Sequence, residues 1–178
     1  LNGLGIKSDF TLGDIKEKLP YGSDFYDVAV CSEVTEHLQE PHLLLNEINR
    51  TLKPGGALIF TTNNDPTVFG LIKRALTFGK TAHEDELGCE VDINGRKLKI
   101  LGHINTRHTL YWEKLCKEAG FKIASFGFHH SIRRHGSRGL FSISVLFLMN
   151  SLVSLLPARL GRFFSSTTAL LLIKQKTA

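Results

Sequence analysis

Cysteine is scarce in this sequence, and its spacing excludes two classes of small domain. Cys31, Cys89 and Cys116 are the three cysteines in 178 residues, and no two of them form a Cys-x-x-Cys pair. Disulfide frameworks and zinc knuckles both need more cysteine at closer spacing. We therefore expect a reducing compartment and a cytoplasmic protein.

A secretory signal and a membrane-spanning run are also missing from the sequence. The most apolar stretch, residues 140–156, ends at Pro157 and is shorter than the roughly 20 residues that a transmembrane helix needs. The net charge of +5 is modest for this length, so nucleic acid is a less favoured partner. Length and composition suit one α/β domain with a sizeable core.

The clearest pattern in the chain is a strand, a helix and a second strand. Apolar, β-branched runs at residues 26–30 and 57–61 predict buried strands. Between them, apolar residues at helical spacing in residues 43–52 predict a helix. The Lys-Pro-Gly-Gly of residues 53–56 should end that helix, because proline cannot continue it and glycine tolerates positive φ. Such a unit is one right-handed crossover of a parallel sheet.

These motifs resemble the second half of a class I S-adenosylmethionine-dependent methyltransferase. In that family, a strand ending in an acidic turn and a Leu-Lys-Pro-Gly-Gly before the next strand recur together. The matching residues here are Asp27, Ser32, Glu33, Glu36, His37 and residues 52–56, with weaker matches at 13–15, 102–103 and 119–121. The resemblance implies an α/β Rossmann-like sheet, S-adenosylmethionine as cofactor, and methyl transfer with oxygen as the favoured acceptor atom.

Two cofactor-binding features of the family are not identifiable. These are the glycine-rich turn after the first strand and the acidic residue that ends the second strand. The Asn-Gly-Leu-Gly of residues 2–5 has no strand before it and no obvious helix after it. We therefore expect a sheet that is incomplete at the N-terminus, and a chain that is unstable when expressed as written.

The partial methyltransferase domain divides into three expected parts. Residues 1–64 form the core near the cofactor, residues 65–101 an insertion or a lid over the acceptor, and residues 102–178 the C-terminal core. In the last part, a helix from Thr109 (or Asn105) should turn Trp112 and Cys116 inward. A strand at residues 121–128 follows, and a terminal strand at 167–174 should pair antiparallel at the sheet edge, as in the family.

By the same resemblance, four residues should contact the cofactor. Asp14 would accept a hydrogen bond from the adenine amino group, and Ile15 would pack on the ring. Cys31 and Ser32 would lie beside the cofactor at the end of the strand. The alternative for Asp14 is a turn or cap before residues 16–19.

Glu33, Glu36 and His37 stand at i, i+3 and i+4, which on a helix places their side chains on one face. Two carboxylates and an imidazole suit magnesium, manganese or zinc. The spacing resembles two metal-using branches of the family, the ubiquinone-biosynthesis O-methyltransferases and the small-RNA 2′-O-methyltransferases. In the RNA enzymes a further histidine comes from a later loop, a part that His103 or His108 could play here.

Glu36, His37 and His103 are therefore the candidate catalytic residues, and the same three with Glu33 are the candidate metal ligands. Two alternatives stay open. The carboxylate could cap a helix while the histidine packs, or His37 could act as a general base without metal. Asn63, Asn64 and Asp65 follow the second strand and could line the substrate entrance or simply form a turn.

The C-terminal part combines basic and apolar residues. Residues 129–138 are densely basic and residues 140–156 almost entirely apolar. This composition predicts that segment 129–164 contacts a membrane surface or a lipid-like acceptor. The alternatives are a solvated loop for the basic part and a core helix for the apolar part. The expected acceptor is a small molecule, a glycan or a lipid-linked molecule. The alternative functions are a metal-dependent RNA 2′-O-methyltransferase-like enzyme and a non-catalytic Rossmann-like module that docks on a membrane or a partner.

Overall fold

The computed structural model describes residues 8–65, 67–68, 71, 89–93, 96–100, 102–129, 155 and 158–176. Several sequence predictions lie outside these residues. They are the Gly-x-Gly of residues 2–5, most of the expected insertion or lid at 65–101, and most of the basic and apolar segment 129–164. No helix within the described ranges is long and apolar enough to cross a membrane.

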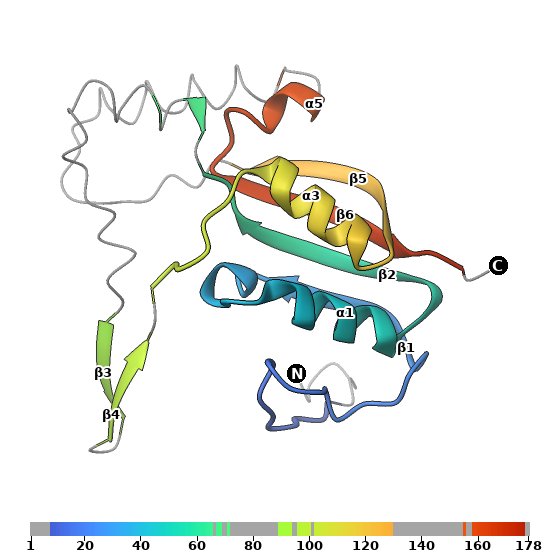
Figure 1. Ribbon diagram of the computed structural model, residues 1–178, viewed down its shortest axis with the longest axis vertical. Helices are drawn as coiled ribbons and strands as arrows, with labels where there is room; N and C mark the ends of the chain where they lie inside the picture. The colour runs from blue at the N-terminus through green and yellow to red at the C-terminus, as the bar shows by residue number, and fades with distance from the viewer. Residues whose placement is uncertain are drawn as a thin grey trace.

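A four-stranded mixed sheet organises the described part of the chain (Figure 1). Its order is β1-β2-β6-β5, with β1 parallel to β2 and the other neighbours antiparallel. The strands are β1 (Tyr26–Ser32), β2 (Leu52–Asn63), β5 (Phe121–His129) and β6 (Thr167–Lys174). The predicted crossover and the antiparallel terminal strand are both confirmed, although β6 lies between β2 and β5 rather than at the sheet edge.

Strand β2 begins earlier than predicted, because the Lys-Pro-Gly-Gly belongs to the strand and not to the end of the helix. Tyr26 pairs with Leu52, and the register then shifts before Val28. Gly55 has a φ of +84° within this irregular stretch, a value that favours glycine. A Cβ on Gly56 would lie 3.1 Å from the carbonyl oxygen of Asp27, so the close approach of the two strands needs glycine.

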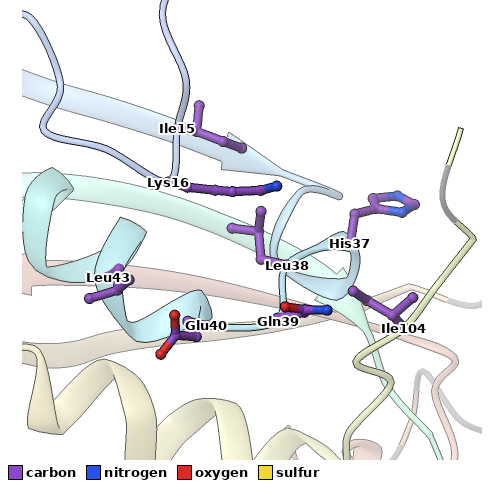
Figure 2. Close-up of a pocket in the computed structure, with 8 residues that line it drawn as sticks. All are labelled: Ile15, Lys16, His37, Leu38, Gln39, Glu40, Leu43 and Ile104. Atoms are coloured by element: carbon purple, nitrogen blue, oxygen red, sulfur yellow. The ribbon is translucent and has the colours of Figure 1, made fainter. Parts of the chain in front are cut away.

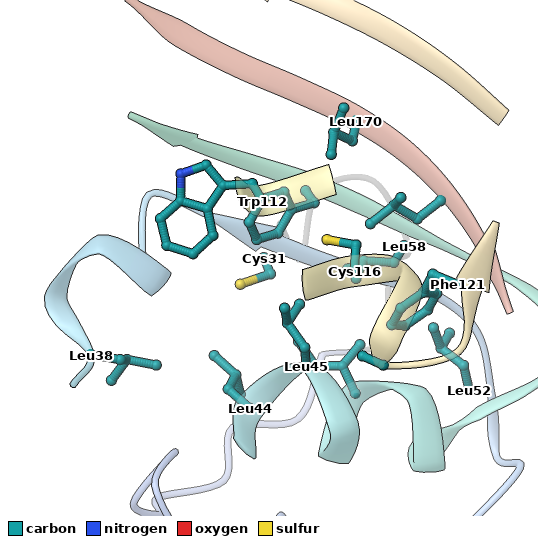
Figure 3. Close-up of a cluster of buried hydrophobic side chains, with 14 residues drawn as sticks. Cys31, Leu38, Leu44, Leu45, Leu52, Leu58, Trp112, Cys116, Phe121 and Leu170 are labelled. Carbon is teal, nitrogen blue, oxygen red and sulfur yellow. The ribbon is translucent and has the colours of Figure 1, made fainter. Parts of the chain in front are cut away.

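Two helices pack on one face of the sheet (Figures 1 and 3). They are α1 (Pro41–Thr51), with its proline in the first turn, and α3 (Thr109–Glu118). The predicted helix start at Thr109 and the inward positions of Trp112 and Cys116 are confirmed, since both side chains are fully buried. The core also contains Leu44, Leu45 and Ile48 from α1, Leu58 and Phe60 from β2, and Leu170 and Leu172 from β6.

The residues that alternate with these core positions face the other side of the sheet. Val28, Val30, Ile59 and Leu171 are all exposed, and Val30 pairs with Ile59, which pairs with Leu171. Period-two alternation therefore places one apolar row under the helices and a second apolar row on a face that the described helices do not cover.

Three smaller elements complete the described chain. A 3₁₀ turn, η2 (Thr35–His37), follows β1, and a short helix, α5 (Ala158–Gly161), precedes β6. β3 (Cys89–Ile93) and β4 (Arg96–Ile100) form a separate antiparallel hairpin. Both strands of the hairpin lie within residues 65–101, the segment expected to be an insertion or a lid.

Candidate functional site

The candidate site lies at the carboxyl ends of the parallel strands β1 and β2, where open α/β sheets bind ligands. The chain leaves β1 through Glu33, whose φ is +52°, in the left-handed region that few non-glycine residues adopt. Its backbone N–H donates to the carbonyl oxygen of Thr61 at 3.0 Å. The predicted placement of Glu33, Glu36 and His37 on one face of a helix is therefore wrong, because Glu33 precedes a single 3₁₀ turn and is not part of a helix.

Glu36 is a fully buried carboxylate within that turn. Its Oε2 accepts a hydrogen bond from the hydroxyl of Thr62 at 3.0 Å, and the Thr62 hydroxyl also accepts from Thr35 at 3.3 Å. Within the described ranges, Oε1 of Glu36 has no hydrogen-bond partner. A buried carboxylate with one unsatisfied oxygen is costly unless a proton, a cation or a ligand joins it.

His37 and His103 come from distant parts of the chain and meet at this carboxylate. Their ring centroids are 4.8 Å apart. Nδ1 of His37 lies 3.2 Å from the carbonyl oxygen of Gly102, and a side-chain nitrogen of Asn63 lies 2.7 Å from Nδ1 of His103. His37 is thus held through Nδ1, whereas the Asn63 nitrogen contacts both ring nitrogens of His103, since it also lies 3.4 Å from Nε2.

The loop that carries His103 is fixed to η2 by main-chain hydrogen bonds. The N–H groups of Ile104 and Asn105 both donate to the carbonyl oxygen of Glu36, at 3.0 and 2.9 Å. The side chain of Asn105 is buried and donates to the carbonyl oxygen of Leu38 at 3.2 Å. These bonds fix the backbone that carries His103, and a preorganised site requires side chains that are held in place in this way.

Together, Glu36, His37 and His103 can each offer one ligand atom, and these atoms all lie within 4.8 Å of one another. Glu33 is not among these three, although it interacts electrostatically with Glu36 and His103. Burial raises the pKa of the Glu33 carboxyl above its usual range, and the charge of Glu36 raises it further. The structure therefore brings three of the four predicted ligands together and places the fourth beside them.

Of the two histidines proposed for the later loop, His103 joins the cluster and His108 does not. His108 caps α3 instead, with Nδ1 accepting from the N–H of Leu110 at 3.2 Å. Burial and the neighbouring Arg162 lower the pKa of His108. His108 is therefore held as a helix cap.

The four predicted cofactor residues lie in different environments. Oδ1 of Asp14 accepts from the N–H of Lys16 at 2.9 Å, the turn geometry named as the alternative. Cys31 is buried in the same hydrophobic cluster as Leu44 and Trp112 (Figure 3). The Ser32 hydroxyl is exposed and hydrogen bonds with that of Thr61 at 2.8 Å. Contact of any of them with the cofactor stays a prediction.

Ile15 faces a cavity of about 190 Å³ that also reaches His37 (Figure 2). Its apolar lining comes from Ile15, Leu38, Leu43 and Ile104, and its polar lining from Lys16, His37, Gln39 and Glu40. Ile15, on one wall of the cavity, belongs to the segment predicted to bind the cofactor. His37, on another wall, belongs to the cluster of Glu36, His37 and His103.

Sequence reasoning missed Thr62 and Asn105, and it left Asn63 and Asn64 as either substrate-lining or turn residues. Asn64 is structural: its Oδ1 accepts from the N–H of Thr109 at 2.8 Å, and its Nδ2 donates to the carbonyl oxygens of Arg162 and Ser165. The polar residues at the end of β2 were the available signal for Asn63. No local pattern marks Thr62 or Asn105, because only the fold brings them to Glu36 and Leu38.

Comparison with known proteins agrees with this geometry. Residues 9–125, more than half of the chain, match the methyltransferase domain family. A 60-residue stretch is 32% identical to the ubiquinone biosynthesis O-methyltransferase of Vibrio atlanticus, covering 34% of this chain and 25% of that protein. The alignment therefore spans about a quarter of that curated relative's length.

Solved structures show the same fold at low sequence identity. A SAM-dependent methyltransferase from Methanosarcina mazei superposes with a TM-score of 0.57 at 17% identity, covering 96% of this chain and 69% of that chain. The [4+2]-cyclase SpnF superposes with a TM-score of 0.56 at 18% identity, covering 99% of this chain and 59% of that chain. The second case shows that this fold also serves other chemistry.

The order and direction of the strands, the acidic turn after β1 and the match over residues 9–125 lead to one assignment. This chain belongs to the methyltransferase domain family and carries part of the Rossmann-like sheet of the class I S-adenosylmethionine-dependent methyltransferases.

Proposed function

We propose that this chain is part of an S-adenosylmethionine-dependent O-methyltransferase in which Glu36, His37 and His103 receive the acceptor hydroxyl. The observation that carries the proposal is the convergence of these three side chains, with ligand atoms within 4.8 Å of one another, at the carboxyl ends of parallel strands. The Vibrio atlanticus relative, whose name describes an O-methyltransferase, supports oxygen as the acceptor atom.

The residues of the cluster fit a divalent cation such as magnesium, manganese or zinc. The fit rests on the buried Oε1 of Glu36, which has no hydrogen-bond partner in the described part of the chain, and on a donor set of one carboxylate and two imidazoles. Glu36, His37 and His103 would hold the ion, with Glu33 beside them. A bound ion would lower the pKa of the acceptor hydroxyl and fix its oxygen in place.

The cluster also contains side chains that can accept the proton that the acceptor hydroxyl releases. Methyl transfer to oxygen forms a carbon–oxygen bond, breaks the carbon–sulfur bond of the sulfonium and releases the hydroxyl proton. In the form of the site without an ion, His37, next to the cavity, or the carboxylate of Glu36 would accept that proton. Asp14 and Ile15 would orient the adenosine, and the apolar walls of the cavity would exclude water from the reacting pair.

For the acceptor, we propose a small molecule, a glycan or a lipid-linked molecule. The cavity of about 190 Å³ has both apolar and polar lining, which suits the hydroxylated end of such a molecule. Membrane-surface contact through residues 129–164 and a cytoplasmic location belong to the same proposal. They rest on the basic and apolar composition of that segment and on the cysteine usage.

Titration of S-adenosylhomocysteine into the chain by calorimetry tests the cofactor part of the proposal. We expect binding that Asp14→Ala weakens. Absence of binding at any concentration, with and without magnesium, manganese or zinc, would contradict it.

The acceptor part is tested by transfer of a labelled methyl group to one representative of each class. Catechol, a monosaccharide and a long-chain phenol in phosphatidylcholine vesicles serve as probes. We expect label on oxygen in at least one of them and its loss in Glu36→Gln. If the chain binds the cofactor product but labels none of the three, the proposed O-methylation is wrong.

A further inference from the structure

Two buried threonines form a chain of hydrogen bonds that ends on Glu36. The hydroxyl of Thr35, in η2, donates to Oγ1 of Thr62, in β2, at 3.3 Å, and the hydroxyl of Thr62 donates to Oε2 of Glu36 at 3.0 Å. All three residues are fully buried. The chain of hydrogen bonds therefore runs from the turn after β1 to the end of β2 and back to the same turn.

The direction of each hydrogen bond follows from the chemistry of the groups. A carboxylate can only accept, so the single hydrogen of the Thr62 hydroxyl goes to Glu36. The oxygen of Thr62 then accepts the hydrogen of the Thr35 hydroxyl, which is the arrangement that the structure shows. Hydrogen bonds in series polarise one another, so the donation from Thr35 strengthens the bond from Thr62 to the carboxylate.

The surroundings of Glu36 would not hold its carboxylate in place without such a donor. Burial removes the hydration that stabilises a carboxylate in water. The carboxyl of Glu33 also interacts with that of Glu36, and two negative charges at this position repel each other. The hydrogen bond from Thr62 opposes that repulsion, because it ties Oε2 of Glu36 to the end of a strand.

We propose that Thr62, supported by Thr35, is the positioning residue of Glu36. Its hydroxyl takes up Oε2 and leaves Oε1, which has no hydrogen-bond partner in the described part of the chain, as the atom that Glu36 offers to the cluster with His37 and His103. This inference rests on the proposed function for its purpose, since a ligand or base role is what uses Oε1. The two threonine hydrogen bonds themselves do not require a bound ion.

Carbon-13 NMR of the metal-free chain, labelled at the side-chain carboxyl groups of glutamate, tests the hydrogen bond to Glu36. The Glu36 signal is assigned by its absence from Glu36→Gln. We expect it to shift in Thr62→Val, which keeps the shape of the side chain without the hydroxyl, and to return towards its natural position in Thr62→Ser. Thr51→Val is the matched control. Thr51 is also buried, but its hydroxyl donates to the carbonyl oxygen of Ile48, so the Glu36 signal should not move.

Zinc affinity, measured by calorimetry on the same proteins, tests whether the hydrogen bond serves the site. Loss of a hydrogen bond that supports a ligand weakens metal binding by about 10- to 100-fold, so Thr62→Val should bind zinc that much more weakly than the natural chain. Thr62→Ser should restore most of the affinity, and Thr51→Val should leave it unchanged. General loss of stability does not produce this pattern, because Thr62→Val and Thr51→Val both remove a hydroxyl from a buried threonine.

An unmoved Glu36 signal in Thr62→Val would overturn the inference whatever the zinc data show. Equal zinc affinity in the natural chain and Thr62→Val, or equal weakening in Thr62→Val and Thr62→Ser, would overturn it too. If the natural chain binds no zinc, the metal part of the proposed function is contradicted, and the carboxyl signal alone decides whether Thr62 positions Glu36. If Thr62→Val does not fold, Thr35→Val, which removes the donor to Thr62, takes its place. The Glu36 signal should still move in that variant, and an unmoved signal would overturn the inference.

Discussion

The hydroxyl of Thr62 donates a 3.0 Å hydrogen bond to Oε2 of Glu36, and both side chains are fully buried. Thr62 lies on β2 and Glu36 on the turn after β1, so this bond joins the ends of two parallel strands. It also fixes the carboxylate with its second oxygen unpartnered in the described part of the chain. The site depends on this arrangement.

Thr62→Val removes the hydroxyl and keeps the shape of the side chain. Hydrogen bonds to charged groups contribute about 1.5–3 kcal/mol, so we expect the free energy of unfolding to fall by about 2 kcal/mol. Urea denaturation of the metal-free chain measures it. Thr62→Ser, which keeps the hydroxyl, is the control and should lose clearly less. Equal losses in both variants would show that the methyl group, and not the hydrogen bond, stabilises this position.

The raised pKa of Glu33 predicts a pH dependence of stability. Its carboxyl is more easily protonated in the folded chain than in the unfolded chain, so the folded state holds more protons and stability is lost as pH rises through the folded pKa. Glu33→Gln removes this loss. We expect the variant to gain stability over the natural chain as pH rises above about 4.3, the unfolded pKa of Glu.

Denaturant unfolding with a chelator present, repeated across that pH range, measures the difference between the two proteins. A difference that does not change with pH would mean that the Glu33 carboxyl titrates alike in the folded and unfolded states, which contradicts the account of its surroundings.

Arg50 and Glu47 form hydrogen bonds with the segment that leads from Asp14 to β1. The guanidinium of Arg50 donates to both carboxylate oxygens of Glu47 and to the carbonyl oxygens of Leu19 and Tyr21, and Glu47 accepts from the N–H of Leu19 at 2.9 Å. Arg50→Ala should lower the free energy of unfolding and speed hydrogen exchange at the Leu19 amide.

The control for Arg50→Ala is Lys53→Ala, which breaks an exposed ion pair with Asp27. Such pairs contribute about 0–1 kcal/mol, so the control should leave Leu19 exchange unchanged. If both variants speed exchange at Leu19 equally, the hydrogen bonds of Arg50 are not what orders this segment.

Burial of two cysteines predicts their chemical reactivity. Burial raises the pKa of the Cys31 and Cys116 thiols to about 12, and the thiolate is the reactive form. In a Cys89→Ser background, iodoacetamide at pH 8 should leave both thiols unmodified in the folded chain and modify both in urea. Mass spectrometry measures the labelling. Rapid labelling of either thiol without denaturant would mean that the core opens readily.

The crossover from β1 through α1 to β2 could be predicted because its signals are local. Apolar runs, the helical spacing after Pro41 and the glycines at 55–56 each act over a few residues, and together with the family resemblance they indicate the crossover. The extension of β2 back to Leu52 could not be predicted, since it depends on how closely β1 approaches Gly56.

The sequence predicted which side chains lie together in the candidate cluster better than it predicted their geometry. Spacing placed Glu33 on a helical face, but its positive φ and the 3₁₀ turn set it apart from Glu36 and His37. The fold brings His103, and not His108, to the cluster, because the bonds from Ile104 and Asn105 to Glu36 fix where the loop lies. Residues that meet only through such long-range contacts leave no periodic signal.

The central claim is that Glu36, His37 and His103 form a cation site. Calorimetric titration of zinc into the chain, into Glu36→Gln and into His42→Ala tests it most directly; His42 is an exposed histidine on α1. The account predicts one zinc site in the natural chain, unchanged in His42→Ala and at least about tenfold weaker in Glu36→Gln, which lacks the anionic ligand. No binding to the natural chain, or equal affinity in Glu36→Gln, would contradict the account.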